Sequence, residues 1–379
     1  QAAKSDRPRH PGHNSGRSAE NGRNINKRVR MMKITKISVV RIVGMFLIFA
    51  THLFLGFYGS SLGYVFNVGV PLFFIISGYL YGKKEIKEPL NWYFRRFVKI
   101  CIPMYIFVLL VWLYCFIRYE AKFPYRYILN LQGLDFIFIK IKGYFALPES
   151  MDGIGHFWFL TVIMLCYLLL ILMKKLESTS FMKNVEKNPK VEVVLCILIV
   201  AVQIALAYVG FQIVYFIEFF LGYAMNKKDL SFKGKKSFLL ISLIMVVALG
   251  TRLVVRKFAD GTVLHDNIVV SWSQCVLALW IYAFFDFLLS NLPRLESALG
   301  KSKLISWLDG ISYFAYITHY IFIEEPFNLQ KYIPNMIVAT LVFLVLSFAS
   351  AEILKLVSKP LTDCLNKLAG KLSKRKLKS

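Results

Sequence analysis

Two ionisable side chains lie inside the first long apolar run of the chain. Arg41 and His52 occur in SVVRIVGMFLIFATHLFLGFYG, residues 38–59, and this run is long enough to cross a bilayer as a helix. Ionisable groups at membrane depth are costly and usually mark a functional site. The two positions are about three helical turns apart, so both side chains share one face, roughly 16 Å apart along the axis. The spacing predicts a cation near one membrane surface and a titratable base deeper in.

The composition places the whole chain among membrane proteins. Hydrophobic residues make up 57% of its 379 residues and aromatic residues 16%, and the mean hydropathy is +0.54, all above the values typical of soluble domains. We expect an all-α integral membrane protein with about ten transmembrane helices. The expected spans are residues 37–58, 64–82, 100–118, 157–173, 191–209, 211–226, 237–255, 268–290, 304–323 and 335–357.

The net charge of +25 is distributed as membrane topology requires. Most of the 47 lysines and arginines fall in the two ends and in the connections on the same side of the membrane as the N-terminus. The positive-inside rule places that side in the cytoplasm. Both termini are therefore expected in the cytoplasm, and the charge needs no nucleic-acid partner to explain it.

Three parts of the chain are expected to differ in character. Residues 1–36 are polar and basic, and they should be disordered because they have few large apolar side chains. Residues 37–357 should form a membrane domain of ten helices. Residues 358–379 should form a basic cytoplasmic tail attracted to anionic lipid.

Several common sites have no counterpart in the sequence. The six cysteines are scattered singly, without a CxxC pair or a Cys/His spacing typical of metal sites. A P-loop and a dinucleotide-binding glycine fingerprint are also lacking. We therefore expect no metal and no tightly bound cofactor, and ATP-driven transport is disfavoured.

Two more histidines are expected at a depth similar to that of His52. His156 opens the fourth span in GIGHFWFL, and His319 lies in the outer half of the ninth span in SYFAYITHYIF. Histidine titrates near neutral pH and serves as a general base, so three of them on three helices suit proton transfer. The alternative for His156 is an interfacial position beside Trp158 in an aromatic belt.

A different chemistry is expected on the cytoplasmic side. NWYFRRFVKICIPMY brings Arg95, Arg96 and Lys99 to the start of the third span, at a depth comparable to that of Arg41. Guanidinium groups bind phosphate through paired hydrogen bonds. These residues indicate either a phosphate-bearing cytosolic ligand or only a topology signal.

Five segments together resemble the acyltransferase 3 family, which comprises bacterial integral-membrane acyltransferases that modify cell-envelope polysaccharides. The segments are R-x10-H from Arg41 to His52, GVPLFFIISGYL at 69–80, YFRRFVKICIP at 93–103, HFWFLTVIMLCYL at 156–168 and SYFAYITHYIF at 312–322. Each is weak alone, but they occur in order across residues 36–357. The chain is most similar to capsular and exopolysaccharide O-acetyltransferases, with succinyltransferase-like members beside them.

The resemblance implies a multi-pass protein of the bacterial plasma membrane that takes an acyl group from a cytosolic acyl-CoA, usually acetyl-CoA, as donor substrate. The acceptor would be a hydroxyl of a polysaccharide or lipid-linked glycan, with membrane lipids and polysaccharide-synthesis machinery as further partners. His52 matches the essential histidine of the family, and Arg41 matches its paired arginine. Arg95 and Arg96 match the arginines associated with donor binding.

Four other positions carry less settled expectations. His156 and His319 match positions that recur in the family, as does Trp158. Glu218 departs from the family pattern, because it places a carboxylate in the span at 211–226 where an apolar or aromatic residue is usual. It either orients His52, lines the path of the acceptor, or forms a structural hydrogen bond between helices.

We assign His52 as general base or acyl carrier, and Arg41 as its electrostatic partner on the donor side. Three alternatives stay open: a transporter or glycan translocase, a structural partner in a polysaccharide synthase complex, and succinyl in place of acetyl transfer. The lack of matching Gly/Pro-broken spans in two halves of the chain disfavours the transporter.

Overall fold

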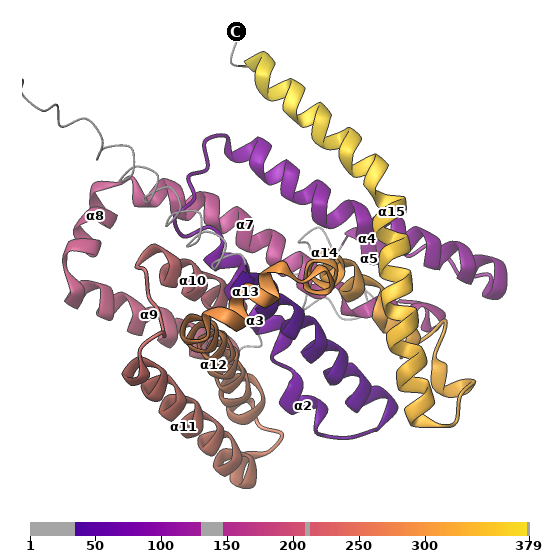
Figure 1. The fold of residues 1–379 in the computed structure, drawn as a ribbon, viewed down its shortest axis with the longest axis horizontal. Helices are drawn as coiled ribbons and strands as arrows, with labels where there is room; N and C mark the ends of the chain where they lie inside the picture. The colour runs from indigo at the N-terminus through magenta and orange to yellow at the C-terminus, as the bar shows by residue number, and fades with distance from the viewer. Residues whose placement is uncertain (1–34, 130–146, 209–212, 377–379) are drawn as a thin grey trace, which may run out of the picture.

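Helices make up almost all of the structured chain. The computed structural model describes residues 35–129, 147–208 and 213–376, and within these ranges it contains helices and no strand (Figure 1). The all-α class is thus confirmed for these ranges. The N-terminal segment expected to be disordered lies, apart from its last two residues, outside the described residues.

The described helices follow one another along the chain, with several short 3-10 and π-helical segments between them. The first helix, Thr35–Phe57, ends in the π-helical turn η1 (Leu53–Phe57). The following elements are α2 (Gly63–Phe66), α3 (Gly69–Tyr79), α4 (Pro89–Tyr119), α5 (Tyr125–Leu129), the 3-10 helix η3 (Glu149–Phe157), α7 (Trp158–Glu177), α8 (Ser180–Lys187) and α9 (Pro189–Tyr208). The last are α10 (Val214–Lys227), α11 (Lys235–Ala259), π-helical η4 (Leu264–Val269), α12 (Val270–Asn291), α13 (Pro293–Lys301), α14 (Lys303–Thr318), the 3-10 turns η5 (His319–Phe322) and η6 (Leu329–Lys331), and α15 (Met336–Lys376).

Seven helices of the described ranges are long and apolar enough to cross a membrane. Three further segments expected as spans, at 64–82, 211–226 and 304–323, fold as the shorter helices α3, α10 and α14, of 11, 14 and 16 residues. Short helices can persist at membrane depth where neighbouring helices cover their ends, since every backbone polar group there needs a partner inside the protein. The protein is a multi-pass, all-α membrane protein.

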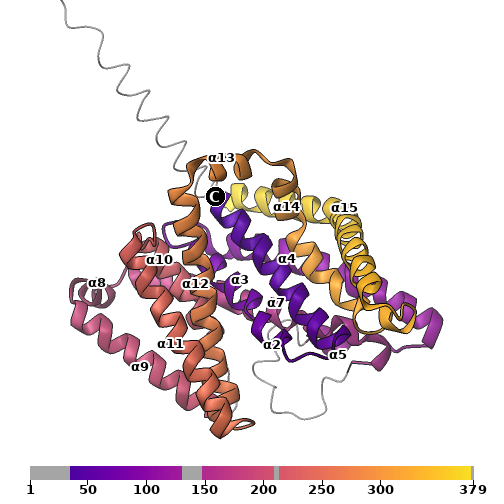
Figure 2. The same ribbon diagram turned by 60° about the horizontal axis from the view of Figure 1, so that its bottom comes forward.

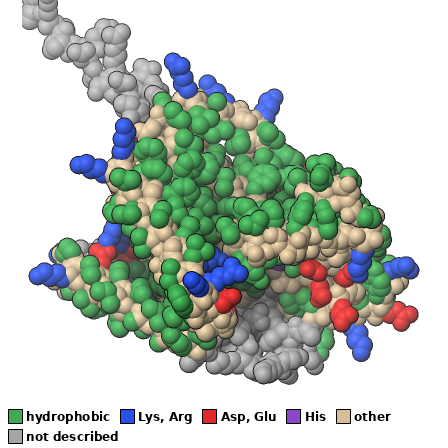
Figure 3. Space-filling model, turned by 90° about the horizontal axis from the view of Figure 1, so that it is seen from below, with side chains coloured by type: hydrophobic (Ala, Val, Ile, Leu, Met, Phe, Trp, Pro, Cys, Tyr) green, Lys and Arg blue, Asp and Glu red, His purple; other side chains and the backbone are tan. Residues whose placement is uncertain are grey.

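The helices separate into an inner and an outer group (Figures 1 and 2). In each long helix we consider the most apolar stretch of 18 residues. Of this stretch, 56% of the residues are buried inside the protein in the first helix and 61% in η3 with α7, but only 11% in α9 and 6% in α11. Hydrophobic side chains cover most of the face in Figure 3, with several Lys and Arg side chains at its edge. This is the surface expected of helices that contact lipid.

Two glycines set the distance between α3 and α10. A Cβ atom added at Gly222 would lie 1.9 Å from the backbone oxygen of Ile75, and one added at Gly78 would lie 1.7 Å from that of Phe219. Small residues allow this close approach of helix backbones in membrane proteins. The pair α3–α10 therefore forms a rigid wall beside α7.

The C-terminal segment differs from the expected tail. Helix α15 runs without interruption from Met336 to Lys376, so residues 358–376 continue the last span as a helix. Lys355 and Lys359 therefore keep the helical phase of the apolar part of α15, and this phase determines the face on which they lie.

Gly222→Ala should destabilise the protein because the new methyl group meets the backbone of α3, with a loss of about 1–3 kcal/mol or more for such overpacking. The melting temperature of the purified protein in detergent measures the loss. Gly250→Ala in α11 is the matched control, since nothing in the described chain lies within 4 Å of a Cβ there. A melting temperature for Gly222→Ala equal to that of the control would contradict the close α3–α10 contact.

Candidate functional site

The three histidines predicted at membrane depth lie together. The ring centroid of His52 is 5.2 Å from that of His319 and 6.4 Å from that of His156, and the last two are 5.0 Å apart. The ring of Tyr320 lies 4.4 Å from that of His52. Three segments far apart in the sequence thus meet at one point.

Each of these histidines occupies a position where the helix geometry changes. His52 directly precedes the π-helical turn η1, His156 lies at the end of the 3-10 helix η3, and His319 stands between α14 and η5. π-helical turns and 3-10 segments inside longer helices often accompany functional sites. Such changes also release backbone carbonyl groups, which can then accept hydrogen bonds from side chains.

The backbone carbonyl of Tyr316 holds two of the histidines. It accepts a hydrogen bond from His156 Nε2 and another from His319 Nδ1, each at 2.8 Å. In return, the Tyr316 hydroxyl donates to the backbone carbonyl of His156 at 2.6 Å. The hydrogen bonds between Tyr316 and His156 are therefore reciprocal, and they fasten α14 to the end of η3.

Two of these histidines face a cavity of about 470 Å³, which we call the histidine cavity. Its lining comprises His52, Leu147, Asp152, Gly155, His156, Trp158, Tyr320 and Glu324. Burial raises the pKa of the Glu324 carboxyl, and the negative charges of Asp152 and Glu325 raise it further. The cavity thus combines imidazole bases, aromatic surfaces and carboxyl groups.

A second cavity, of about 530 Å³, has the opposite charge, and we call it the basic cavity. Its charged lining comprises Arg41, Arg96, Lys99, Lys355 and Lys359 with the acids Asp309 and Asp363, from the first helix, α4, α14 and α15. The apolar side chains Phe73, Phe159 and Leu160 belong to the same lining, together with Tyr316. Such a cavity suits a ligand with anionic groups at one end and a neutral, apolar end.

The two cavities meet at Tyr316. Its side chain lines the basic cavity, while its hydrogen-bond partner His156 lines the histidine cavity. The rings of Tyr316 and His156 are 5.1 Å apart, and the ring of Phe159 lies 5.3 Å from that of Tyr316. A group that passes between the cavities here has to displace or pass this contact.

Arg41 lies in the basic cavity and not beside His52. Its guanidinium forms an ion pair with Asp309 at 2.5 Å, and the same carboxylate accepts a hydrogen bond from Ser38 at 2.8 Å. The arginine is therefore held in place by α14, the helix that ends directly before His319. The two residues of the first helix face different cavities, as their separation of about three turns allows.

Arg95 and Arg96 occupy different environments. Arg96 lines the basic cavity, and its guanidinium lies over the rings of Tyr81 and Trp92 at 5.4 and 5.7 Å. Its buried Nε has no hydrogen-bond partner in the described part of the chain. Arg95 does not belong to the lining of the described cavity; it bonds to Asn91 at 3.3 Å and lies close to Gly370 of α15.

The two buried carboxylates of the spans behave differently. Asp286 forms an ion pair with Lys36 and accepts hydrogen bonds from Ser231 and from the backbone N–H of Phe232. It therefore has a structural role, because it connects α12 to the first helix and to the segment that precedes α11. Glu218 is 1% exposed, and its Oε2 has no partner among the described residues. It lies near Tyr215, outside the lining of both described cavities.

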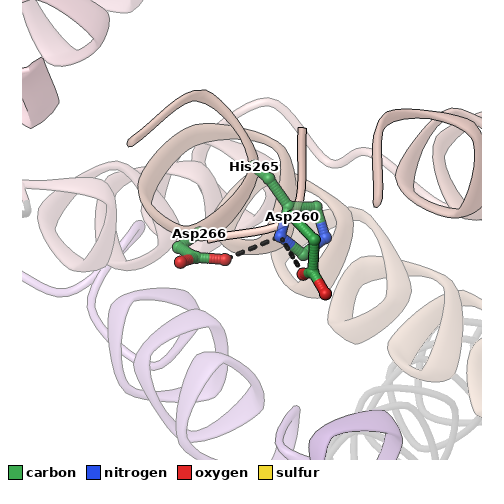
Figure 4. Close-up of side chains that lie close together, drawn as sticks. All are labelled: Asp260, His265 and Asp266. Carbon is green, nitrogen blue, oxygen red and sulfur yellow. Dashed lines mark hydrogen bonds and ion pairs between the residues drawn. The ribbon is translucent and has the colours of Figure 1, made fainter. Parts of the chain in front are cut away.

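A further polar cluster lies at the connection between α11 and α12 (Figure 4). His265 Nδ1 is bonded to Asp266 at 2.6 Å and lies 3.4 Å from Asp260. An Nδ1–H that donates to a carboxylate does not at the same time ligate a metal ion. We therefore interpret the cluster as a hydrogen-bonded Asp–His pair that stabilises the start of α12.

A family model described as an acyltransferase domain matches residues 34–353. The chain belongs to the acyltransferase 3 family. The match covers all three histidines, Arg41 and the arginines of α4. The searches of curated proteins and of solved structures found no match.

Three charged residues that no sequence motif indicates also line the basic cavity. Asp309 fixes Arg41, and Lys355 and Lys359 add cations to the basic cavity from beyond the range that the family model matches. The sequence held a signal for the lysines, because their spacing of four places them on one helix face. The pairing of Asp309 with Arg41 depends on how two distant helices pack.

The Arg41–Asp309 ion pair should show a measurable coupling. In a double-mutant cycle with Arg41→Ala and Asp309→Ala, we expect a coupling energy near the lower end of the 0.5–3 kcal/mol range, at about 1 kcal/mol, because partial exposure screens the pair. Unfolding of the purified protein in detergent measures it.

The ion pair Lys83–Asp229, whose side chains are 48% and 76% exposed, is the matched control. Its coupling energy should stay below about 0.5 kcal/mol. Equal coupling energies for the two pairs would contradict the special position of Arg41.

Proposed function

We propose that this acyltransferase transfers an acetyl group from cytosolic acetyl-CoA to a hydroxyl of a cell-envelope or exported polysaccharide. One observation carries the proposal: a basic cavity and a histidine cavity meet at the contact between Tyr316 and His156. The first has the chemistry of a donor site, and the second that of an acceptor site with a base.

The donor would occupy the basic cavity. Its arginines and lysines match the phosphate groups of coenzyme A, to which guanidinium groups donate paired hydrogen bonds. The apolar wall of Phe73, Phe159 and Leu160 favours a neutral acyl group. Acetyl therefore fits better than succinyl, whose free carboxylate would need a cation at that wall.

The acceptor would occupy the histidine cavity. Trp158 and Tyr320 offer aromatic faces to a sugar ring, and the carboxyl groups of Asp152 and Glu324 offer hydrogen-bond acceptors to its hydroxyl groups. His52 lines this cavity and lies where it can take a proton from such a hydroxyl.

The acyl transfer forms one bond and breaks one bond at the acyl carbon, and His52 accepts the proton that is released. As the hydroxyl oxygen forms a bond to the acyl carbon, its proton passes to His52, the C–S bond breaks, and coenzyme A leaves as a thiolate that then takes up a proton. A positioned base contributes about 10²–10⁴-fold. If His52 instead carries the acyl group, its nitrogen bonds to the acyl carbon as the C–S bond breaks. In a second step the hydroxyl oxygen bonds to the acyl carbon as this N–C bond breaks, and the released imidazole takes up the hydroxyl proton.

The arrangement in the membrane follows from charge. We place the basic cavity toward the cytoplasm, together with both termini, because the positive-inside rule puts the lysine- and arginine-rich connections there. In this topology the short helices α3, α10 and α14 complete about ten spans. The enzyme would act in the bacterial plasma membrane.

His52→Ala should abolish acylation of envelope glycan, with a loss of about 10² -fold or more, while the protein level in the membrane stays unchanged. Mass spectrometry of the glycan measures the acyl content. His265→Ala is the matched control, because that histidine lies at the α11–α12 connection. Normal acylation in His52→Ala would refute the assignment of the base, whereas lost export with normal acylation would favour a translocase.

Arg96→Ala should weaken binding of acetyl-CoA by about tenfold or more, since a charge-assisted hydrogen bond contributes about 1.5–3 kcal/mol. Arg95→Ala should have a clearly smaller effect, because only Arg96 lines the described cavity. Calorimetry with a non-hydrolysable acetyl-CoA analogue measures both. Arg96→Lys keeps the charge and should recover part of the affinity; equal affinities for all variants would contradict the donor site.

A further inference from the structure

The hydrogen bonds to Tyr316 determine where two histidines carry their protons. A carbonyl oxygen only accepts hydrogen bonds, so His156 Nε2 and His319 Nδ1, which both bond to the Tyr316 carbonyl, must carry hydrogen. In the neutral rings the other nitrogens, His156 Nδ1 and His319 Nε2, then carry lone pairs. Both nitrogens are buried, and neither has a hydrogen-bond partner within the described ranges.

A buried acceptor requires a donor, and most rings around His319 offer none. Phe49 stacks on the His319 ring at 4.9 Å, and Phe343 lies against it at 6.4 Å. The N–H of His156 is already bonded to the Tyr316 carbonyl.

The two neighbouring tyrosines are also engaged. The Tyr316 hydroxyl donates to the backbone carbonyl of His156, and the Tyr320 side chain is hydrogen-bonded to Glu324. Of the aromatic and imidazole rings that pack on His319 in the described chain, His52 alone has an N–H free to donate, and its ring lies 5.2 Å away.

We propose that His319 is the positioning residue for His52: its Nε2, unpaired in this structure, accepts the N–H of His52 once the His52 ring, 5.2 Å away, turns toward it. This inference rests on the proposed function, in which His52 is the reactive base. It assigns His319 a role through His52 and not through contact with the substrate, in agreement with its exclusion from the described lining of the histidine cavity.

The consequence concerns the other nitrogen of His52. Once one nitrogen donates to His319, the second carries the lone pair, and the ring is held so that this lone pair can meet a substrate in the cavity that His52 lines. A nucleophile or base oriented by a third group is the general logic of such sites. When His52 takes up a proton, the first N–H stays bonded to His319, so the ring does not turn.

His156 suits a different task. Its ring is farther from His52, at 6.4 Å against 5.2 Å for His319, and it lines the histidine cavity itself. The His156 ring therefore faces the cavity directly, whereas His319 is absent from the described lining. Both histidines donate a hydrogen bond to the Tyr316 carbonyl, but His319 is directed to His52 and His156 to the histidine cavity.

Two isosteric variants separate the two nitrogens of His319. His319→Asn retains a donor near the Nδ1 position and loses the acceptor, whereas His319→Gln offers an oxygen near the Nε2 position. We expect kcat to fall on the order of 10²-fold in His319→Asn through misplacement of His52, and clearly less in His319→Gln. The KM for acetyl-CoA should stay unchanged in both, which also shows that the variants are folded.

Wild-type kcat in His319→Asn, or equal losses of kcat in the two variants, would overturn the proposal. A merely structural role would lower protein level and donor binding together. The loss of kcat would then not depend on whether the variant retains the atom near Nδ1 or the atom near Nε2.

A spectroscopic measurement on the full chain tests the hydrogen bond without catalysis. With ¹⁵N-labelled histidine in lipid nanodiscs, the His319 Nε2 resonance should shift in His52→Ala, because its donor is removed. Ser347→Ala is the control, since Ser347 is the buried hydroxyl next to Thr318, and it should leave that resonance in place. An unmoved resonance in His52→Ala would overturn the proposal, while a wild-type chain with this hydrogen bond but no acyl transfer would refute only the proposed function.

Discussion

The backbone carbonyl of Tyr316 is the group on which the site depends. It lies one turn before α14 changes into a 3-10 turn, and it accepts hydrogen bonds from two buried imidazoles. A polar group buried without a partner costs several kcal/mol in an apolar medium, on the order of 2–7 kcal/mol, so these bonds specify how the helices assemble. These hydrogen bonds determine how η3 and α14 are positioned relative to each other along their lengths.

The same cost explains why the polar groups are divided between two cavities. Arg41 is always charged, so it requires a counter-ion at membrane depth, and Asp309 supplies it. Imidazoles can stay neutral, so the histidines need only hydrogen bonds and can sit deeper among aromatic rings. The charged pair and the neutral cluster are linked by α14, which carries Asp309, Tyr316 and the residue before His319.

The sequence was sufficient to identify the class, the three histidines and the cationic side of the site. The helical period and the distribution of lysine and arginine can both be read along a single helix, so they predict how Arg41 and His52 lie relative to each other. Packing between distant helices is not encoded in this way, so the sequence does not identify Asp309 as the partner of Arg41, nor does it bring the lysines of α15 to the basic cavity. Arg95 and Arg96 are neighbours that differ by about 100° around α4, and the sequence could not tell which one faces the cavity.

The contact between Tyr316 and His156 has a chemical consequence for the proposed reaction. A thioester that shared a cavity with water and an activating base would be open to hydrolysis, and exclusion of water from reactive intermediates is a general requirement of acyl transfer. Here the apolar wall of Phe159 and Tyr316 stands between the basic cavity and His52. In the proposed reaction the base would meet the acyl carbon only when the group passes this wall, so the contact would keep the thioester apart from His52 until then. The reciprocal hydrogen bonds thus connect assembly with the proposed chemistry: the interaction that positions the histidines would also form the barrier that the acyl group has to pass.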